Sequence, residues 1–207
     1  MSNEPIIDKK RIKANTLRGP ILVMIRGMPG SGKSYLASAL QDLIGKEKVV
    51  LLDPDQIDKA SKAYVDLSEA LTAEGIEMKF HPNRFLKAKG FKAILAHQII
   101  IWNQAFTDLG GFNRTIEPLQ TFASEHSLKL PTLVVEVEVD HSVAKARIAK
   151  REAAGGHGVP EDAFARFAST YASFFDQGFN TVILDGQDDI LISATTVKHA
   201  LETLEND

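Results

Sequence analysis

The sequence contains one motif whose residue types and spacing are typical of phosphate binding. Residues 27–34 match the pattern G-x-x-x-x-G-K-[ST] at every fixed position. The glycines let the backbone turn tightly and direct several N–H groups toward one point, which suits the phosphates of a nucleoside triphosphate. Lys33 would contact the β- and γ-phosphates, and the hydroxyl of Ser34 would bind Mg²⁺. The predicted nucleotide-binding residues are Gly27, Met28, Pro29, Gly30, Ser31, Gly32, Lys33, Ser34 and Tyr35.

The residues on either side predict the strand and the helix that such a motif needs. Residues 21–26 form an aliphatic run typical of a buried parallel strand, and apolar residues recur at helical spacing over residues 36–44. The positive end of the helix dipole would strengthen the anion site. The alternative is a glycine- and proline-rich turn that binds nothing, but the strand before it and the helix after it favour a P-loop.

The rest of the chain alternates strand-like and helix-like segments. This alternation predicts an α/β fold of the P-loop NTPase type, with a five-stranded parallel sheet and helices on both faces. Glu136 and Glu138 alternate with valines in the fourth strand, so we expect the later part of that strand to be exposed on one face. A helix is expected from about Thr115 to His126, with Pro118 in its first turn. The four further strands are expected at residues 49–52, 99–102, 131–139 and 181–184.

We expect a single kinase-like domain over residues 1–207. It would consist of an N-terminal tail (1–19), the sheet, a helical insert near the acceptor site (56–98) and a helical lid (141–175). The insert shows no strand-like run, and a non-helical break is expected within it at residues 78–84.

Composition excludes several classes of function. The chain has no cysteine, which excludes disulfides and thiolate metal sites. Its net charge of −3 gives no general attraction to nucleic acid or to an anionic membrane. No apolar run approaches the length of a membrane span, and the first twenty residues lack the apolar core of a signal peptide. These features favour a cytoplasmic protein.

Two carboxylates follow the second predicted strand. Pro54 ends the strand, so Asp53 and Asp55 should lie at the carboxyl edge of the sheet, where ligands bind in open α/β folds. A carboxylate there could accept the proton of an attacking hydroxyl. We expect Asp55 to be the base, with Asp53 as the alternative base, and we expect Asp53 to contact the substrate. In the alternative, both residues only cap a helix beginning at Gln56.

Arginines in the predicted lid could supply positive charge to the transferring phosphoryl group. Arg147 and Arg151 are four residues apart and therefore share a helix face, and Arg166 follows on the next helix. The break at Gly155-Gly156 would allow a lid to close and exclude water. Guanidinium groups match the geometry of phosphate oxygens. The alternative is an ordinary solvated basic face.

The acceptor side is expected to involve two segments. Asn83 and Arg84 fall in the predicted break at residues 78–84, which could also be an ordinary turn between helices. Asn103, Gln104 and Thr107 follow the third strand. Many P-loop proteins place an acidic residue for Mg²⁺ at the end of such a strand, whereas amides stand there in this chain.

Three blocks resemble the zeta toxin family and its relatives among small P-loop kinases. The likeness spans residues 20–185 in outline, and the blocks are Gly27–Ser34, Leu52-Asp-Pro-Asp55 and Arg147-x-x-x-Arg-x-x-x-Gly-Gly-His-x-Val-Pro160. The resemblance implies a kinase that uses ATP or GTP with Mg²⁺ and phosphorylates a hydroxyl of UDP-N-acetylglucosamine. It also implies that Asp55 is the base and that Arg147, Arg151 or Arg166 supplies the lid cation.

One departure bears on the acceptor. Zeta toxins carry an acidic residue and a threonine after the third strand, where this chain has Asn103, Gln104 and Thr107. We therefore expect a kinase of a small hydroxyl compound, with a nucleotide sugar as one candidate. The alternatives are a polynucleotide or nucleoside kinase, and a nucleotide-dependent switch that hydrolyses its nucleotide slowly. The resemblance allows a protein antitoxin as partner, although no feature of the sequence identifies one.

Overall fold

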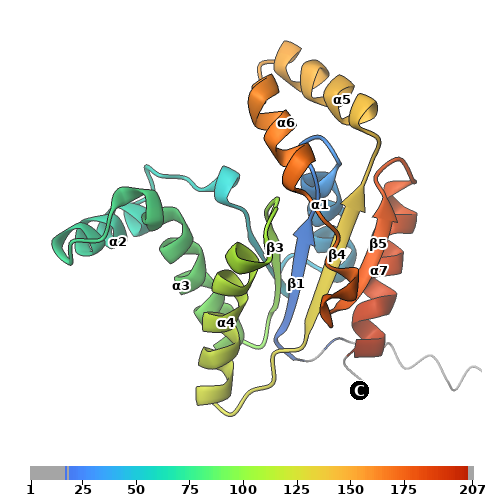
Figure 1. The fold of residues 1–207 in the computed structure, drawn as a ribbon. Coiled ribbons are helices and arrows are strands. Elements are labelled where there is room, and N and C mark those ends of the chain that lie inside the picture. Colours follow the sequence, from blue (N-terminus) through green and yellow to red (C-terminus); the bar gives the residue numbers. More distant parts are fainter. Residues whose placement is uncertain (1–16, 18, 205–207) are drawn as a thin grey trace, which may run out of the picture.

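The computed structural model of the 207-residue chain describes residue 17 and residues 19–204. The expected N-terminal tail therefore lies almost wholly outside the described residues. Five parallel strands form one sheet in the order β2-β3-β1-β4-β5, as Figure 1 shows. This arrangement confirms the predicted fold class. The strands are β1 (Ile21–Arg26), β2 (Val49–Leu52), β3 (Ile99–Asn103), β4 (Thr132–Glu138) and β5 (Asn180–Asp185).

Helices cover both faces of the sheet because the central strand is apolar on both sides. Ile21, Val23 and Ile25 of β1 pack with α1 (Lys33–Ile44) and α7 (Ile190–Leu204). The alternate residues of β1 pack with α3 (His81–Leu95) and α4 (Leu109–Glu125) on the opposite face. Every residue of β1 is buried, as expected for the middle strand of a parallel sheet. The remaining helices are α2 (Lys62–Ala73), α5 (His141–Ala153) and α6 (Glu161–Thr170).

The expected start of α4 is wrong. The helix begins at Leu109, because the side chain of Asp108 caps it and accepts a hydrogen bond from the Gly111 amide at 2.7 Å. Pro118 therefore lies inside the helix and cannot donate a bond to the Arg114 carbonyl one turn earlier. Lys87 of α3 donates to that carbonyl instead, at 2.8 Å. A lysine thus replaces the hydrogen bond that the proline removes and ties α3 to α4.

The expected non-helical break at residues 78–84 is also wrong. Met78–Phe80 form a 3₁₀ turn that leads directly into α3, with Pro82 in the first turn of the helix. His81 is buried there, and its ring contacts the Ser68 hydroxyl at 2.7 Å and the Ile76 carbonyl at 2.9 Å. These contacts hold α2 against α3. In Figure 1 the two helices form an arm at the side of the sheet.

The prediction that the end of β4 is exposed holds for Glu138 and is wrong for Glu136. Because β4 lies between β1 and β5, Glu136 is fully buried, and its Oε1 accepts a bond from Arg26 Nη1 at 2.5 Å. The same oxygen accepts the Phe174 amide, and Oε2 accepts the Ser173 hydroxyl, each at 2.6 Å. We call this cluster the Arg26–Glu136 network. Residues 171–174, which follow α6, cover this end of the strand.

No helix in the described part of the chain is long and apolar enough to cross a membrane.

Breaking the buried pair should destabilise the protein strongly. The Glu136→Gln substitution keeps the side-chain shape but leaves the Arg26 charge buried without a counterion, so we expect a loss of about 3–5 kcal/mol in the free energy of unfolding. Urea denaturation monitored by circular dichroism measures this change. Asp162→Asn is the matched control, because it removes one partner of the exposed pair Asp162–Arg166, and we expect a change below about 1 kcal/mol. Equal effects of the two substitutions would contradict the assignment.

Candidate active site

The P-loop joins β1 to α1 and packs against the end of β4 and against α5. Gly30 has φ +82°, and a Cβ there would lie 2.5 Å from the Ala144 carbonyl oxygen. At Gly27, with φ +151°, a Cβ would lie 2.4 Å from the Val137 carbonyl oxygen. A side chain at either position would force the loop away from these neighbours. These two glycines therefore allow the P-loop to lie directly against β4 and α5.

Lys33 points back across the P-loop. Its ammonium donates to the Met28 carbonyl at 2.8 Å. The pKa of Lys33 is lowered from 10.5 to about 8, chiefly by burial and to a smaller extent by the nearby charge of Arg151. The carboxylates of Asp53 and Asp55 act in the opposite direction. Lys33 thus lies among the acids that follow β2 and a cation of α5, where a further negative charge would stabilise its protonated form.

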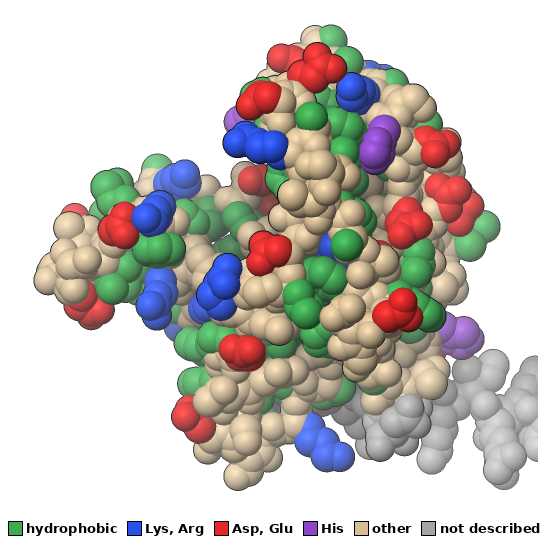
Figure 2. All heavy atoms as spheres, viewed as in Figure 1, with side chains coloured by type: hydrophobic (Ala, Val, Ile, Leu, Met, Phe, Trp, Pro, Cys, Tyr) green, Lys and Arg blue, Asp and Glu red, His purple; other side chains and the backbone are tan. Residues whose placement is uncertain are grey.

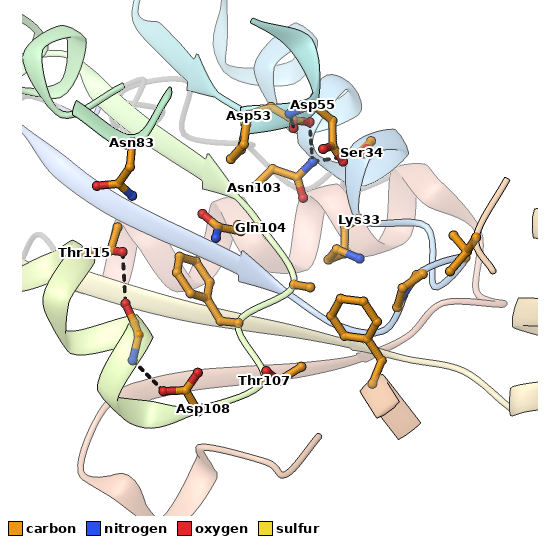
Figure 3. A pocket seen from close by; sticks show the side chains of 18 of the residues that line it. Lys33, Ser34, Asp53, Asp55, Asn83, Asn103, Gln104, Thr107, Asp108 and Thr115 are labelled. Carbon is orange, nitrogen blue, oxygen red and sulfur yellow. Dashed lines mark hydrogen bonds between the residues drawn. The ribbon is translucent and has the colours of Figure 1, made fainter. Parts of the chain in front are cut away.

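Ser34, Asn103 and Asp53 form a polar cluster beside the P-loop, with Asn103 between the other two (Figure 3). The Asn103 Nδ2 group donates to Ser34 Oγ at 2.9 Å and to Asp53 Oδ2 at 2.7 Å. The Asn103 Oδ1 atom is buried and accepts no hydrogen bond from the described residues. Hydroxyl, carboxylate and amide oxygens suit Mg²⁺ and its bound waters. The described residues contain no cluster of three or more acidic or histidine side chains that could hold a metal ion. A bound Mg²⁺ would therefore take further ligands from phosphate oxygens or water.

The two acidic residues after β2 differ in their surroundings. Asp53 is buried, caps the 3₁₀ turn Pro54–Gln56, and accepts bonds from the Asp55 amide, the Gln56 amide group and Asn103. The Asp55 carboxylate is exposed and accepts no hydrogen bond from the described residues. Asp55 therefore keeps a carboxylate that can accept a proton, whereas Asp53 holds its neighbours in position.

A cleft of about 1130 Å³ opens from the P-loop toward α3 and α4. All five acceptor-side residues expected besides Asp53 line it, and Figure 3 shows Asn83, Gln104 and Thr107 across the cleft from Lys33. Several residues that line the cleft were not predicted from the sequence. Lys87 could have been found from its helical spacing to Asn83, whereas the residues of α4 depend on where that helix begins. The polar and aromatic residues missed are Phe80, Lys87, Phe106, Asp108, Arg114, Thr115 and Phe167.

The three arginines expected in the lid have different environments. Arg147 donates to the Ser31 carbonyl at 3.2 Å and to the Gly186 carbonyl at 2.8 Å, so it joins the P-loop to the loop after β5. Arg151 lines the cleft, and its Nε donates to the His157 carbonyl at 2.8 Å. Arg166 is exposed, forms an ion pair with Asp162 at 3.6 Å and does not line the cleft. The structure thus brings Arg147 and Arg151, but not Arg166, to the P-loop.

A second pocket of about 470 Å³ adjoins the P-loop, and Arg147 lines both cavities. It lies between α1 and the loop after β5, a loop that was not predicted from the sequence to be part of the site. Its lining includes Ser31, whose buried hydroxyl has no hydrogen-bond partner among the described residues. The other polar residues that line it are Tyr35, Asp185, Asp188, Asp189 and Ser193.

Solved structures with this fold include small kinases. A protein from Chloroflexus aurantiacus is 17% identical with a TM-score of 0.61, and the match covers 91% of this chain and 99% of that one. A gluconokinase from Sinorhizobium meliloti is 18% identical with a TM-score of 0.55, covering 92% and 95%. The APS kinase of Mycobacterium tuberculosis, solved with AMPPNP and APS, is 18% identical with a TM-score of 0.50, covering 89% and 98%.

At these identities the likeness shows the fold alone. A search of curated protein sequences found no match. The family model described as AAA domain matches residues 22–174, from β1 to the segment after α6. This match includes the P-loop, the acids after β2 and both cleft-facing arginines. The chain therefore belongs to this AAA-domain family of P-loop NTPases.

Proposed function

We propose that this protein is a kinase that transfers the γ-phosphoryl group of ATP or GTP to a hydroxyl group of a small molecule. The observation that carries the proposal is the exposed Asp55 carboxylate, which lines the same cleft as Lys33 and Arg151 and accepts no hydrogen bond from the residues that the structure describes. A protein that only binds nucleotide needs a P-loop, but it does not need a proton acceptor facing a cavity of this size. The kinase fold of the solved structures described above supports the same reading.

The two cavities suggest where the nucleotide and the acceptor would each bind. The phosphates would lie on the P-loop, with the nucleoside in the smaller pocket between α1 and the loop after β5. Arg147 lies where the two cavities meet. The acceptor would then occupy the larger cleft, between Asp55 and the side chains of Asn83, Gln104 and Thr107.

The residues of the cleft can perform an in-line transfer. Asp55 would accept the proton of the acceptor hydroxyl while its oxygen forms a bond to the γ-phosphorus. The bond from that phosphorus to the β,γ-bridging oxygen breaks, and the nucleoside diphosphate leaves. Lys33 and Arg151 would stabilise the negative charge on the transferring group. Ser34, with Asp53 and Asn103 beside it, would hold Mg²⁺, which neutralises charge on the β- and γ-phosphates when bound.

The first test supplies the protein with Mg²⁺, γ-labelled ATP and a small-molecule extract. We expect a labelled small molecule in the wild-type reaction and none with Lys33→Ala, because the variant lacks the cation that contacts the phosphates. UDP-N-acetylglucosamine, the acceptor suggested by the zeta toxin resemblance, is tested alongside the extract. Phosphate release that depends on Lys33 without any labelled product would contradict the kinase proposal and favour a nucleotide-dependent switch.

A second prediction concerns the base. Asp55→Asn keeps the size of the side chain but cannot accept the proton, so we expect transfer to fall by roughly 10²- to 10⁴-fold while ATP binding is unchanged. Steady-state transfer rates and calorimetric titration with ATP measure the two quantities. Asp66→Asn on the exposed face of α2 is the matched control and should leave both unchanged. An Asp55→Asn variant with full transfer activity would remove this base assignment.

The third prediction concerns the charge of Lys33. With a pKa of about 8, its amine should become reactive near pH 8, whereas Nα-acetyllysine free in solution should react near the ordinary lysine pKa of about 10.4. Bound MgATP should raise the Lys33 pKa, so nucleotide affinity should weaken as pH rises above 8, since the neutral amine must then take up a proton. Competitive acetylation read by mass spectrometry gives both labelling midpoints. Identical midpoints for Lys33 and Nα-acetyllysine would refute the shift.

A further inference from the structure

Three cations line the acceptor half of the cleft. Arg84 and Lys87 come from α3, and Arg114 comes from α4. None of them takes part in the ion pairs of the described residues, although exposed cations elsewhere, such as Lys62 and Lys145, do find carboxylates. Figure 2 shows Lys and Arg side chains, with acidic side chains among them, over the arm of α2 and α3, beside the hollow that separates this arm from α5 and α6. In a chain of net charge −3, the three cations Arg84, Lys87 and Arg114 on one side of the cleft favour the binding of an anion.

Lys87 is held at the cleft rather than free in solvent. Its ammonium donates to the Arg114 carbonyl, the group freed by Pro118, and two of its three N–H donors remain for a ligand. Burial lowers the pKa of Lys87, and the neighbouring charge of Arg84 lowers it further. Like charges held together in this way repel each other, and an anion bound between them would relieve that repulsion.

Arg114 completes the cluster from the other helix. A Cβ at Gly110 would lie 3.3 Å from one of its guanidinium nitrogens and 3.3 Å from Asp108 Oδ1, so the guanidinium lies above the first turn of α4. Asp108 is the acidic residue beside it. That carboxylate caps α4 through the Gly111 amide, and the ion pairs of the described residues include none between Asp108 and Arg114. The guanidinium therefore keeps donors for a ligand in the cleft.

We propose that Arg84, Lys87 and Arg114 bind an oxyanion carried by the acceptor, so that this kinase phosphorylates a hydroxyl compound that already bears a phosphate, sulfate or carboxylate group. The inference rests on the proposed function, since it names the class of acceptor. Guanidinium groups bind oxyanions through paired hydrogen bonds, and the lysine adds a third cation. Phe80 and Phe106 line the same cleft and would contact the uncharged part of the acceptor.

The test divides the small-molecule extract on an anion exchanger before the labelling reaction. We expect labelled product from the retained, anionic fraction and none from the flow-through. Product formed only from the flow-through would overturn this inference while leaving the kinase proposal intact. Product from neither fraction would count against the kinase proposal, and the anion site would then be judged by binding alone.

Two double variants test the anion site both by the KM for the anionic fraction and by sulfate binding. Arg84→Gln with Arg114→Gln removes two cations whose side chains are exposed, and Lys89→Gln with Lys92→Gln removes two exposed cations of α3 that do not line the cleft. With the anionic fraction, the first variant should raise KM by about tenfold or more with little change in kcat, because each charge-assisted bond to the anion is lost. The control variant should behave as wild type. Equal KM values in all three proteins would overturn the assignment.

Sulfate is the probe for binding without chemistry. The protein is first saturated with AMPPNP and Mg²⁺, so that the P-loop is occupied, and sulfate is then titrated by calorimetry at low ionic strength. Wild type and the Lys89/Lys92 variant should bind sulfate, and the Arg84/Arg114 variant should bind it about tenfold or more weakly. Equal affinity in the three proteins, or no binding to wild type, would overturn the proposed anion site.

Discussion

The buried ion pair between Arg26 and Glu136 is the interaction on which the site depends. Arg26 is the last residue of β1, directly before the P-loop, and Glu136 lies near the end of β4. Two buried charges are tolerated only when their remaining hydrogen-bonding groups are satisfied. The guanidinium achieves this by donating to the carbonyls of Phe106 and Ala172 and by stacking on the Phe174 ring, 3.6 Å from its centroid. The pair therefore gathers four chain segments at one end of the sheet.

Those segments also position residues that line the cleft. Phe106 belongs to the loop after β3 that also presents Gln104 and Thr107, and it adopts φ +41°, which a non-glycine residue rarely takes without support. Residues 171–174 return the chain from α6 to β5 and so close the helical hairpin that holds Arg147 and Arg151. The buried ion pair thus fixes the positions of the loop after β3 and of α5 relative to the P-loop. Fixed positions of these segments would allow an acceptor hydroxyl and a γ-phosphate to approach in line.

Charge is distributed unevenly along the cleft. The phosphate end combines Lys33, whose pKa is lowered to about 8, with Arg151 and the exposed carboxylate of Asp55. At the far end are the unpaired cations of α3 and α4, held in place by the bond from Lys87 to the Arg114 carbonyl. Asp55, the base in the proposed reaction, lies at the phosphate end. Such an arrangement would orient an acceptor that is anionic at one end and presents a hydroxyl at the other.

The sequence by itself determined the class of fold, the P-loop and the position of the acids after β2, because each depends on residues adjacent in the chain. Spacing could also place Arg147 and Arg151 on one helix face. Tertiary structure alone decided that Glu136 is buried, that Asp53 supports the site while Asp55 faces the cleft, and that Arg114 meets Lys87. These outcomes depend on strand order and on contacts between distant segments, such as the 110 residues that separate Arg26 from Glu136. Local patterns carry no information about which distant group supplies a buried charge with its partner.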